Sequence, residues 1–274
     1  MSTPSPIPRL DSPGGDLLDL LAASVPARLD TEGVHRIRVA IKQTRAWLKL
    51  RRGDKQLQLD DRPVVDDLRA LSAALAGQRD RDVAVQTLTR LARKYPGHKA
   101  QLLTQALCQR LSLWQPPARD IQTVSALCER IRQTLPPFLQ QPVPPQVQVD
   151  VLHKSHARQC RRGERALASG ACCDLHTWRK RVKTLGYQLQ MVTVTVVAGG
   201  KLFRLLNKLG KKLGDVHDLC FLQAWVEQMV VEDNITLDPA PLYKRIARER
   251  KALLAIAHRD FARVCAAPLV LRAD

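Results

Sequence analysis

The chain lacks several features that would place it in a common class of protein. Only 4% of its 274 residues are aromatic, which gives little support to binding single-stranded nucleic acid by stacking bases on aromatic rings. No apolar run approaches the ~18 residues of a membrane-spanning helix, and the N-terminal stretch "MSTPSPIPRLDSPGG" lacks the apolar core of a signal peptide. We therefore expect a soluble, cytoplasmic protein with no membrane partner.

The cysteines form no pattern typical of a structural site. There are seven, an odd number, and no C-x-x-C pair occurs. We expect neither a disulfide framework nor a zinc site. Reduced thiols in a cytoplasm fit this pattern better.

Positive charge is what the sequence has in excess. The 44 Lys and Arg residues outnumber the 26 Asp and Glu residues, giving a formal net charge of +18. Such a charge disfavours a compact fold by self-repulsion unless an anion is bound, although an apolar content of 45% is ample for a packed core. From Leu175 to Gly214 there is no acidic residue, so local ion pairs cannot neutralise this stretch. These features indicate a globular protein with a polyanionic partner.

Leucine and alanine recur at spacings of three and four along most of the chain, as in amphipathic helices. Breaks at Gly and Pro predict helices at about 15–28, 33–53, 62–77, 80–95, 98–115, 119–135, 147–168, 174–197, 201–213, 216–231 and 240–266. The β-branched stretch 191–200 resembles a strand, but we find no second strand to pair with it and expect a helix end and a linker. The sequence predicts an all-α fold.

Two motifs occur twice, in the same order. "HRIRVAIKQTRAWL", from His35, aligns with "HTWRKRVKTLGYQL", from His176. Downstream, "LAGQRDRDV", from Leu75, aligns with "LGDVHDLCF", from Leu213. Repetition of this kind predicts an internal duplication, with two similar helical bundles related by a pseudo-two-fold axis.

A proline-rich stretch near the middle of the chain separates the two copies. The segment 136–146 contains five prolines, which exclude a continuous helix. We predict a disordered tail at 1–14, a first helical half at 15–135, a linker at 136–146 and a second helical half at 147–274.

The helix that begins near His35 carries a stripe of cations between two apolar flanks. At 100° per residue, an arc of about 100° holds His35, Arg38, Lys42, Arg45, Lys49 and Arg52. One flank contains Ile37, Ile41 and Leu48, and the other contains Val39, Ala46 and Leu50. An ordinary solvated face lies opposite a single apolar stripe. Because apolar residues lie on both sides of the basic stripe, we predict that the stripe is a cationic wall that faces a groove or channel.

Three further sets of basic residues follow helical spacing. The helix that begins near His176 repeats the layout with His176, Arg179, Lys180 and Lys183. Two other predicted helices carry Lys154, Arg158, Arg161 and Arg165, and Lys201, Arg204, Lys208 and Lys211.

These motifs resemble the CHAD domain family, named for a conserved histidine α-helical domain. The resemblance rests on the two His-x-x-Arg-x-x-x-Lys helices, on "RDRDV" from Arg79 and on "LGDVHDL" from Leu213, and it extends from about residue 15 to 266. It implies two helical bundles that enclose a basic central channel or groove binding inorganic polyphosphate, and some members localise to polyphosphate granules. The E-x-E-x-K signature of the triphosphatase domain that some members carry is absent.

The resemblance also implies which residues contact the ligand. On this chain they are His35, Arg38, Lys42, Arg45, His176, Arg179, Lys180 and Lys183, extended by Arg79, Lys201, Arg204, Lys208 and Lys211. The basic stripes add Lys49, Arg158, Arg161 and Arg165. Gly186 stands where the first copy has Arg45, and His217 replaces Arg79, so the second half is expected to bind less strongly.

Simpler interpretations stay open. A run of Lys and Arg is often only a solvated face, and His35 and His176 are as readily explained as buried histidines. A metal role is not expected, because neither helix has a second His or a carboxylate four residues further on. Asp80 and Asp218 are expected to be structural, either as helix N-caps or as acceptors that orient a basic side chain.

We expect non-enzymatic binding of inorganic polyphosphate or another phosphate-rich polyanion, without a cofactor. No carboxylate cluster is evident for the magnesium that phosphoryl chemistry requires. The alternatives are a nucleic-acid-binding helical protein and an enzyme that processes polyphosphate or nucleotides. Neighbouring cations should favour neutral histidines in an empty channel, so affinity should rise as the pH falls from about 8 to 6.

Overall fold

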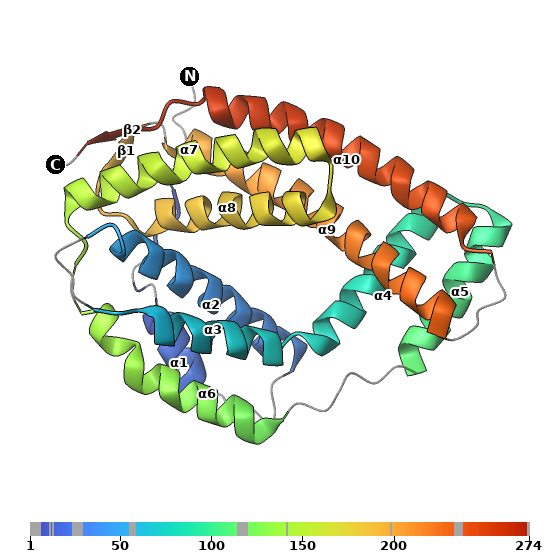
Figure 1. Cartoon of the computed structure of the whole chain (residues 1–274), viewed down its shortest axis with the longest axis horizontal. Helices are drawn as coiled ribbons and strands as arrows, with labels where there is room; N and C mark the ends of the chain where they lie inside the picture. Colours follow the sequence, from blue (N-terminus) through green and yellow to red (C-terminus); the bar gives the residue numbers. More distant parts are fainter. Residues whose placement is uncertain are drawn as a thin grey trace.

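The computed structural model describes residues 7–10, 12, 14–23, 30–54, 59–113, 120–140, 142–197, 199–232 and 238–272 (Figure 1). The helices of the first part are α1 (Gly15–Ala23), α2 (Thr31–Arg51), α3 (Arg62–Ala74), α4 (Gly77–Lys94), α5 (His98–Leu113) and α6 (Ile121–Thr134). After a 3-10 turn, η2 (Pro136–Phe138), come α7 (Pro145–Ser169), α8 (Cys172–Met191), α9 (Gly199–Glu232) and α10 (Ala240–Ala266). The prediction of an all-α fold is confirmed.

A small sheet corrects the sequence-based expectation for residues 191–200. The strand β1 (Thr195–Val197) pairs with β2 (Val270–Arg272) in antiparallel register, with Val196 opposite Leu271. The expectation of only a helix end and a linker is wrong here. A partner strand of three residues is too short for an alternating pattern to be recognised in the sequence.

The helices predicted at 201–213 and 216–231 form the single helix α9. A glycine inside a helix costs only about 1 kcal/mol relative to alanine. The buried side chains Leu213, Val216 and Leu219 continue the apolar seam past Gly214. The predicted break is wrong because this burial outweighs the cost of the glycine.

Two hydrophobic cores organise the fold. Helices α1, α2, α3 and α6 surround a core that includes Leu17, Leu68 and Ile131. A larger core includes Leu88 of α4, Trp178 of α8 and much of α7, α9 and α10. The larger core therefore contains side chains from both predicted halves, and the pseudo-two-fold relation between the halves stays a prediction.

The apolar flanks of α2 enter these two different cores. Ile37, Ile41 and Leu48 are buried in the core of the first part. On the other flank, Ala46 and Leu50 are buried in the larger core. The cationic stripe between the flanks therefore lies where the two cores meet, and α2 packs there against α8 (Figure 1).

Parts of the predicted tail and linker are packed. The backbone N–H of Leu10 donates to the carbonyl of Gln190 at 2.9 Å, and Ile7 lies against the larger core. The indole N–H of Trp47 donates to the carbonyl of Phe138 at 3.3 Å. Disorder is therefore wrong for residues 7–10, because Ile7 and Leu10 pack against the larger core, a contact that the sequence of the short tail does not reveal.

Candidate functional site

Helices α8 and α9 run antiparallel in a regular register. This pair of helices is one of the most extensively packed in the fold. Side chains that meet across the interface recur about one turn apart along both helices. The pairs in contact or within reach are Cys172 with Cys220, His176 with His217, Arg179 with Gly214, and Lys183 with Gly210.

Two glycines of α9 give the long cations of α8 room to lie against it. A Cβ atom added at Gly210 would lie 3.1 Å from Cε of Lys183. One added at Gly214 would lie 3.5 Å from Nε of Arg179. Both cations are consequently half-buried on the surface of α9.

His176 is half-buried beside His217, and the two ring centroids lie 4.2 Å apart. Burial lowers the pKa of His176, and the neighbouring charges of Lys180 and Arg179 lower it further. The prediction that its surroundings favour the neutral imidazole is confirmed for this residue. Its Nδ1 atom is buried without a hydrogen-bond partner among the described residues.

Cations of α2 and α8 converge where these helices pack. Burial lowers the pKa of Lys49 to about 8, with further contributions from Arg181 and Arg45. Burial also lowers the pKa of Lys180, and Arg45 and Arg179 add to this effect. Since each cation disfavours the charge of the next, cations from separate helices lie within electrostatic reach of one another.

The convergence defines a cationic seam between α2, α3 and α8. Burial followed by the charge of Arg69 lowers the pKa of Arg45, which brings α3 into the group. Burial followed by the charge of Arg179 lowers the pKa of Lys183. The cationic seam consists of Arg45, Lys49, Arg69, Lys180 and Arg181, where α2, α3 and α8 meet, and of Arg179 and Lys183, which extend it along α8 toward α9.

The centre of the cationic seam has no counter-charge within the described part of the chain. There, Arg45, Lys49, Lys180 and Lys183 take part in no ion pair, and Nε of Arg45 is buried without a hydrogen bond. Arg45, Lys49 and Lys183 are partly buried, whereas Lys180 is exposed. Partly buried cations without partners are costly. This arrangement is suited to an anion that supplies the missing charge.

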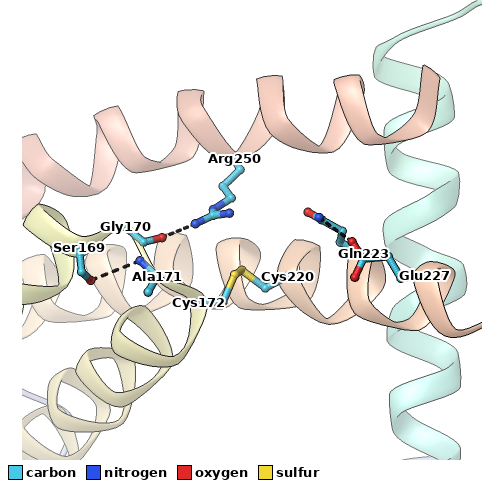
Figure 2. Close-up of a disulfide and its surroundings, with 8 residues drawn as sticks. All are labelled: Ser169, Gly170, Ala171, Cys172, Cys220, Gln223, Glu227 and Arg250. Carbon is cyan, nitrogen blue, oxygen red and sulfur yellow. Dashed lines mark hydrogen bonds between the residues drawn. A yellow bond between two sulfur atoms is a disulfide. The ribbon is translucent and has the colours of Figure 1, made fainter. Parts of the chain in front are cut away.

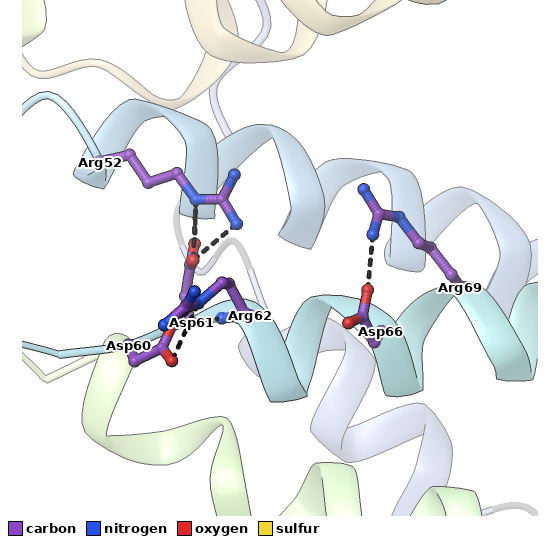
Figure 3. A network of polar contacts seen from close by, with 6 residues as sticks. All are labelled: Arg52, Asp60, Asp61, Arg62, Asp66 and Arg69. Atoms are coloured by element: carbon purple, nitrogen blue, oxygen red, sulfur yellow. Dashed lines mark hydrogen bonds and ion pairs between the residues drawn. The ribbon is translucent and has the colours of Figure 1, made fainter.

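The edge of the site is different, because its arginines have acidic partners (Figure 3). A guanidinium nitrogen of Arg52 lies 2.6 Å from a carboxylate oxygen of Asp61. Arg69 pairs with Asp66 at 2.5 Å on the outside of α3. The arginines at the edge are neutralised by carboxylates, whereas the cations at the centre are not. The centre is therefore the place where an anionic ligand would supply the missing negative charge.

The N-terminal part of the α2 stripe lies away from the cationic seam. His35 is exposed, and it lies about 15 Å along the helix axis from Arg45. The Nη1 atom of Arg38 donates to the carbonyl of Ser72 at 2.7 Å, which ties α2 to α3. Lys42, which lies between Arg38 and Arg45 along the stripe, is half-buried.

The remaining predicted contacts lie on other surfaces. Seven of the predicted contacts are exposed to solvent on α7 and α9, namely Arg158, Arg161, Arg165, Lys201, Arg204, Lys208 and Lys211. Lys208 lies about 160° around α9 from Gly210, so this stripe faces away from the cations of α8. Arg79 belongs to α4, but its side chain is outside the described residues.

Neither aspartate predicted to be structural is a helix N-cap. Asp80 lies within the first turn of α4, whose N-cap is Ala76. Asp218 lies in the middle of α9, because that helix is continuous. The N-cap interpretation is therefore wrong for both, and the interpretation as acceptors for basic side chains stays a prediction.

Sequence reasoning missed two members of the cationic seam. Arg181 lies 200° around α8 from Arg179 and so falls off the basic stripe. Arg69 lies on the exposed side of α3, opposite the buried Leu68 and Leu71. Only the packing of α2 against both helices brings these two arginines to the site.

A hollow of about 500 Å³ lies on α4, lined by Val85, Gln86, Thr89, Arg90, Arg93 and Lys94. Arg90 pairs with Asp215 at 3.3 Å, and Lys94 pairs with Glu249 at 2.6 Å. Because two of its three cations already have carboxylate partners, this hollow is a weaker candidate for an anion site than the cationic seam.

One cysteine pair corrects the expectation of reduced thiols. Cys172 at the start of α8 and Cys220 on α9 form a disulfide (Figure 2). They are 48 residues apart in the sequence, so only the packing of α8 on α9 reveals the pair. Cys108, Cys128, Cys160, Cys173 and Cys265 are free.

Among the described helices, none has the length and apolar content to cross a membrane. The CHAD domain family model matches residues 15–266. No curated protein matches the sequence. A solved structure, the crystal structure of the CHAD domain from the plant Ricinus communis, aligns with a TM-score of 0.62 over 99% of both chains at 17% identity. At this identity the likeness concerns the fold alone.

Proposed function

The chain belongs to the CHAD domain family, and from this premise we propose that it binds inorganic polyphosphate in the cationic seam without catalysing a reaction. The observation that carries the proposal is the group of partly buried cations that lack acidic partners. Granule association and a cytoplasmic location are part of the same proposal.

The chemistry of the cationic seam suits a thin chain of phosphates. Polyphosphate carries about one charge per phosphate and has no bases that need aromatic partners. Arginine forms paired hydrogen bonds to phosphate oxygens, and lysine supplies a mobile point charge. Both types are present on α2 and on α8, so a phosphate chain between these helices would neutralise cations from both.

Nucleic acid is the second candidate, supported by the net charge of +18. The large aromatic side chains near the site do not favour it. Trp178 is fully buried, Trp47 is 9% exposed, and Tyr187 is half-buried. Stacking on aromatic rings contributes much of the affinity for single strands, so polyphosphate is the better candidate.

A competition titration tests the proposal. Long-chain polyphosphate should displace duplex DNA from the protein at equal phosphate concentration, and the reverse order would overturn the proposal. Lys251→Ala, an exposed cation of α10, is the matched control and should leave both affinities unchanged. Incubation with polyphosphate and magnesium should leave chain length unchanged, whereas shortening that Arg45→Ala abolishes would establish an enzyme instead.

A further inference from the structure

Helices α7 and α10 cross at close range in an antiparallel arrangement. Contacts between them involve rising residue numbers on α7 and falling ones on α10, in the pairs His156 with Val264, Gly163 with Phe261 and Gly170 with Arg250. A Cβ atom added at Gly163 would clash with the ring of Phe261. The helices are therefore near enough at this level for short side chains to meet.

Two free cysteines lie one turn from this close approach. Cys160 precedes Gly163 by three residues, and Cys265 follows Phe261 by four. Both spacings keep side chains on one face of a helix, so the antiparallel register brings the two cysteines to the same level. The thiol of Cys265 donates a hydrogen bond to Sγ of Cys160. Their sulfur atoms are therefore in contact without being bonded.

The surroundings of Cys160 favour its thiolate. Besides the Cys265 thiol, Nε2 of Gln159 donates to Sγ of Cys160 at 3.1 Å. Gln159 is fully buried, and its Oε1 accepts from the indole N–H of Trp178 at 3.4 Å, which fixes the amide. The hydrogen bond from Cys265 lowers the pKa of Cys160 although burial opposes this, and the same bond raises the pKa of Cys265. Cys160 is therefore the more readily ionised nucleophile of the two.

Charge and access also suit this pair to oxidation. The nearby charges of Glu164 and Arg161 act on the pKa of Cys160 in opposite directions, and both cysteines are half-buried, so a small neutral oxidant can reach the sulfur atoms. We propose that Cys160 and Cys265 are an oxidation site, at which a hydroperoxide converts the two thiols into a disulfide that joins α7 to α10.

The reaction balances with hydrogen peroxide as the oxidant. The Cys160 thiolate attacks one peroxide oxygen, the O–O bond breaks, and the departing hydroxide takes up the thiol proton and leaves as water. Cys160 is then a sulfenic acid. The Cys265 sulfur attacks Sγ of Cys160, the S–O bond breaks, and the hydroxide leaves as water with the Cys265 proton. The two thiols lose two electrons, and one peroxide becomes two waters.

The new bond would fasten the last free edge of the larger core. Only a short turn separates α7 from α8, and the Cys172–Cys220 disulfide already joins α8 to α9 (Figure 2). A bond between Cys160 and Cys265 would join α7 to α10 and close these four helices into a ring. No cation of the cationic seam belongs to α7 or α10, so the proposal does not rest on polyphosphate binding.

Peptide mapping of the whole protein tests the proposal. Protein that carries the Cys172–Cys220 disulfide is treated with equimolar hydrogen peroxide, alkylated in denaturant and digested with trypsin without reduction. We expect a disulfide-linked pair of peptides, 159–161 and 264–272, and a fall in alkylated thiols from five to three per chain. A Cys160 that stays alkylated, is linked to another cysteine or is oxidised to sulfinic acid would overturn the proposal.

Single variants separate the roles of the two thiols. Cys265→Ser should hold Cys160 as a sulfenic acid that dimedone labels, whereas Cys160→Ser should leave Cys265 unlabelled. Cys108→Ser, at a half-buried cysteine of α5, is the control and should still form the bond. Circular dichroism checks that each variant is folded, and the wild-type peptide map decides whether the bond forms even if one is not. Dimedone labelling of Cys265 in Cys160→Ser would contradict the assignment of Cys160 as the nucleophile.

Thermal unfolding tests whether the bond fastens the helices. Because the bond closes a long loop of the unfolded chain, peroxide treatment should raise the thermal midpoint of wild type by about 5–10 °C. The midpoint of Cys160→Ser should stay unchanged under the same treatment. A bond that forms without raising the wild-type midpoint would contradict the inferred fastening of α7 to α10.

Discussion

The two basic helices with the same motif, α2 and α8, are held in place differently. Helix α8 is joined to α9 by a disulfide and by the paired rings of His176 and His217. Helix α2 has an exposed histidine at its N-terminal end and is held by its two apolar flanks. Their cations converge only near Arg45 and Lys180. Similar motifs therefore supply different parts of one site, with α8 as the fixed wall.

Loss of the covalent link should have the largest effect on stability. A disulfide across a loop of this length contributes about 2–4 kcal/mol to the free energy of unfolding. We expect Cys172→Ser to lower that free energy by about this amount in oxidising buffer, measured by urea unfolding. Cys173→Ser should be neutral, and equal stability of the two variants would show that α8 does not depend on the link.

Removing one cation from each helix should have the largest effect on binding. Charge-assisted hydrogen bonds contribute about 1.5–3 kcal/mol each, and mobile side chains and solvent reduce the net loss. We expect Arg45→Ala combined with Lys180→Ala to weaken polyphosphate binding by about 10- to 100-fold. Lys208→Ala combined with Lys211→Ala, on the outward face of α9, should change it less than threefold.

Lys49 should couple the stability of α2 to ligand binding. Folding lowers its pKa from an ordinary value of 10.5 to about 8, mainly by burial. Between pH 8 and 10.5 the unfolded chain therefore binds more protons at Lys49 than the folded chain does. Below pH 8 the burial of charged Lys49 lowers the free energy of unfolding by its full amount, and this loss of stability becomes smaller as the pH rises.

We expect Lys49→Met to raise the thermal midpoint of the ligand-free protein at pH 7 and to weaken polyphosphate binding. The gain in stability should shrink toward pH 10, where wild-type Lys49 is already neutral. Thermal unfolding of both proteins at pH 7 and pH 10 measures this. A midpoint lower than that of wild type at pH 7 would mean that Lys49 has an acidic partner.

The smallest expected effect is on the pH dependence of polyphosphate affinity, which should differ between variants of His176 and His35. The lowered pKa of His176 favours the neutral ring in the free protein, and a bound phosphate should raise that pKa. Affinity should therefore increase as the pH falls from about 8 to 6. We expect His176→Ala to flatten this dependence and His35→Ala to preserve it, and a flat wild-type profile would make His176 purely structural.

The sequence was enough to predict the helical fold and the stripe of α2. Its basic residues and both apolar flanks follow one helical period, and Ile41 and Leu50, which represent the two flanks, are both buried. That the flanks enter separate cores was not predicted. Arg69, Arg181 and the Cys172–Cys220 disulfide depend on contacts between helices that are distant in the sequence. Helical periodicity within one segment contains no information about such contacts.

The salt dependence of polyphosphate binding tests the central claim, that the ligand occupies the cationic seam between α2 and α8. The slope of log Kd against log salt concentration counts the charge contacts, at about 0.7 per phosphate of a single-stranded polyanion. Relative to wild type, Arg45→Ala with Lys180→Ala should reduce this slope by about 1.4, and Lys208→Ala with Lys211→Ala should leave it unchanged. A slope that falls only in the second double variant would place the ligand on the outer face of α9 and contradict the account.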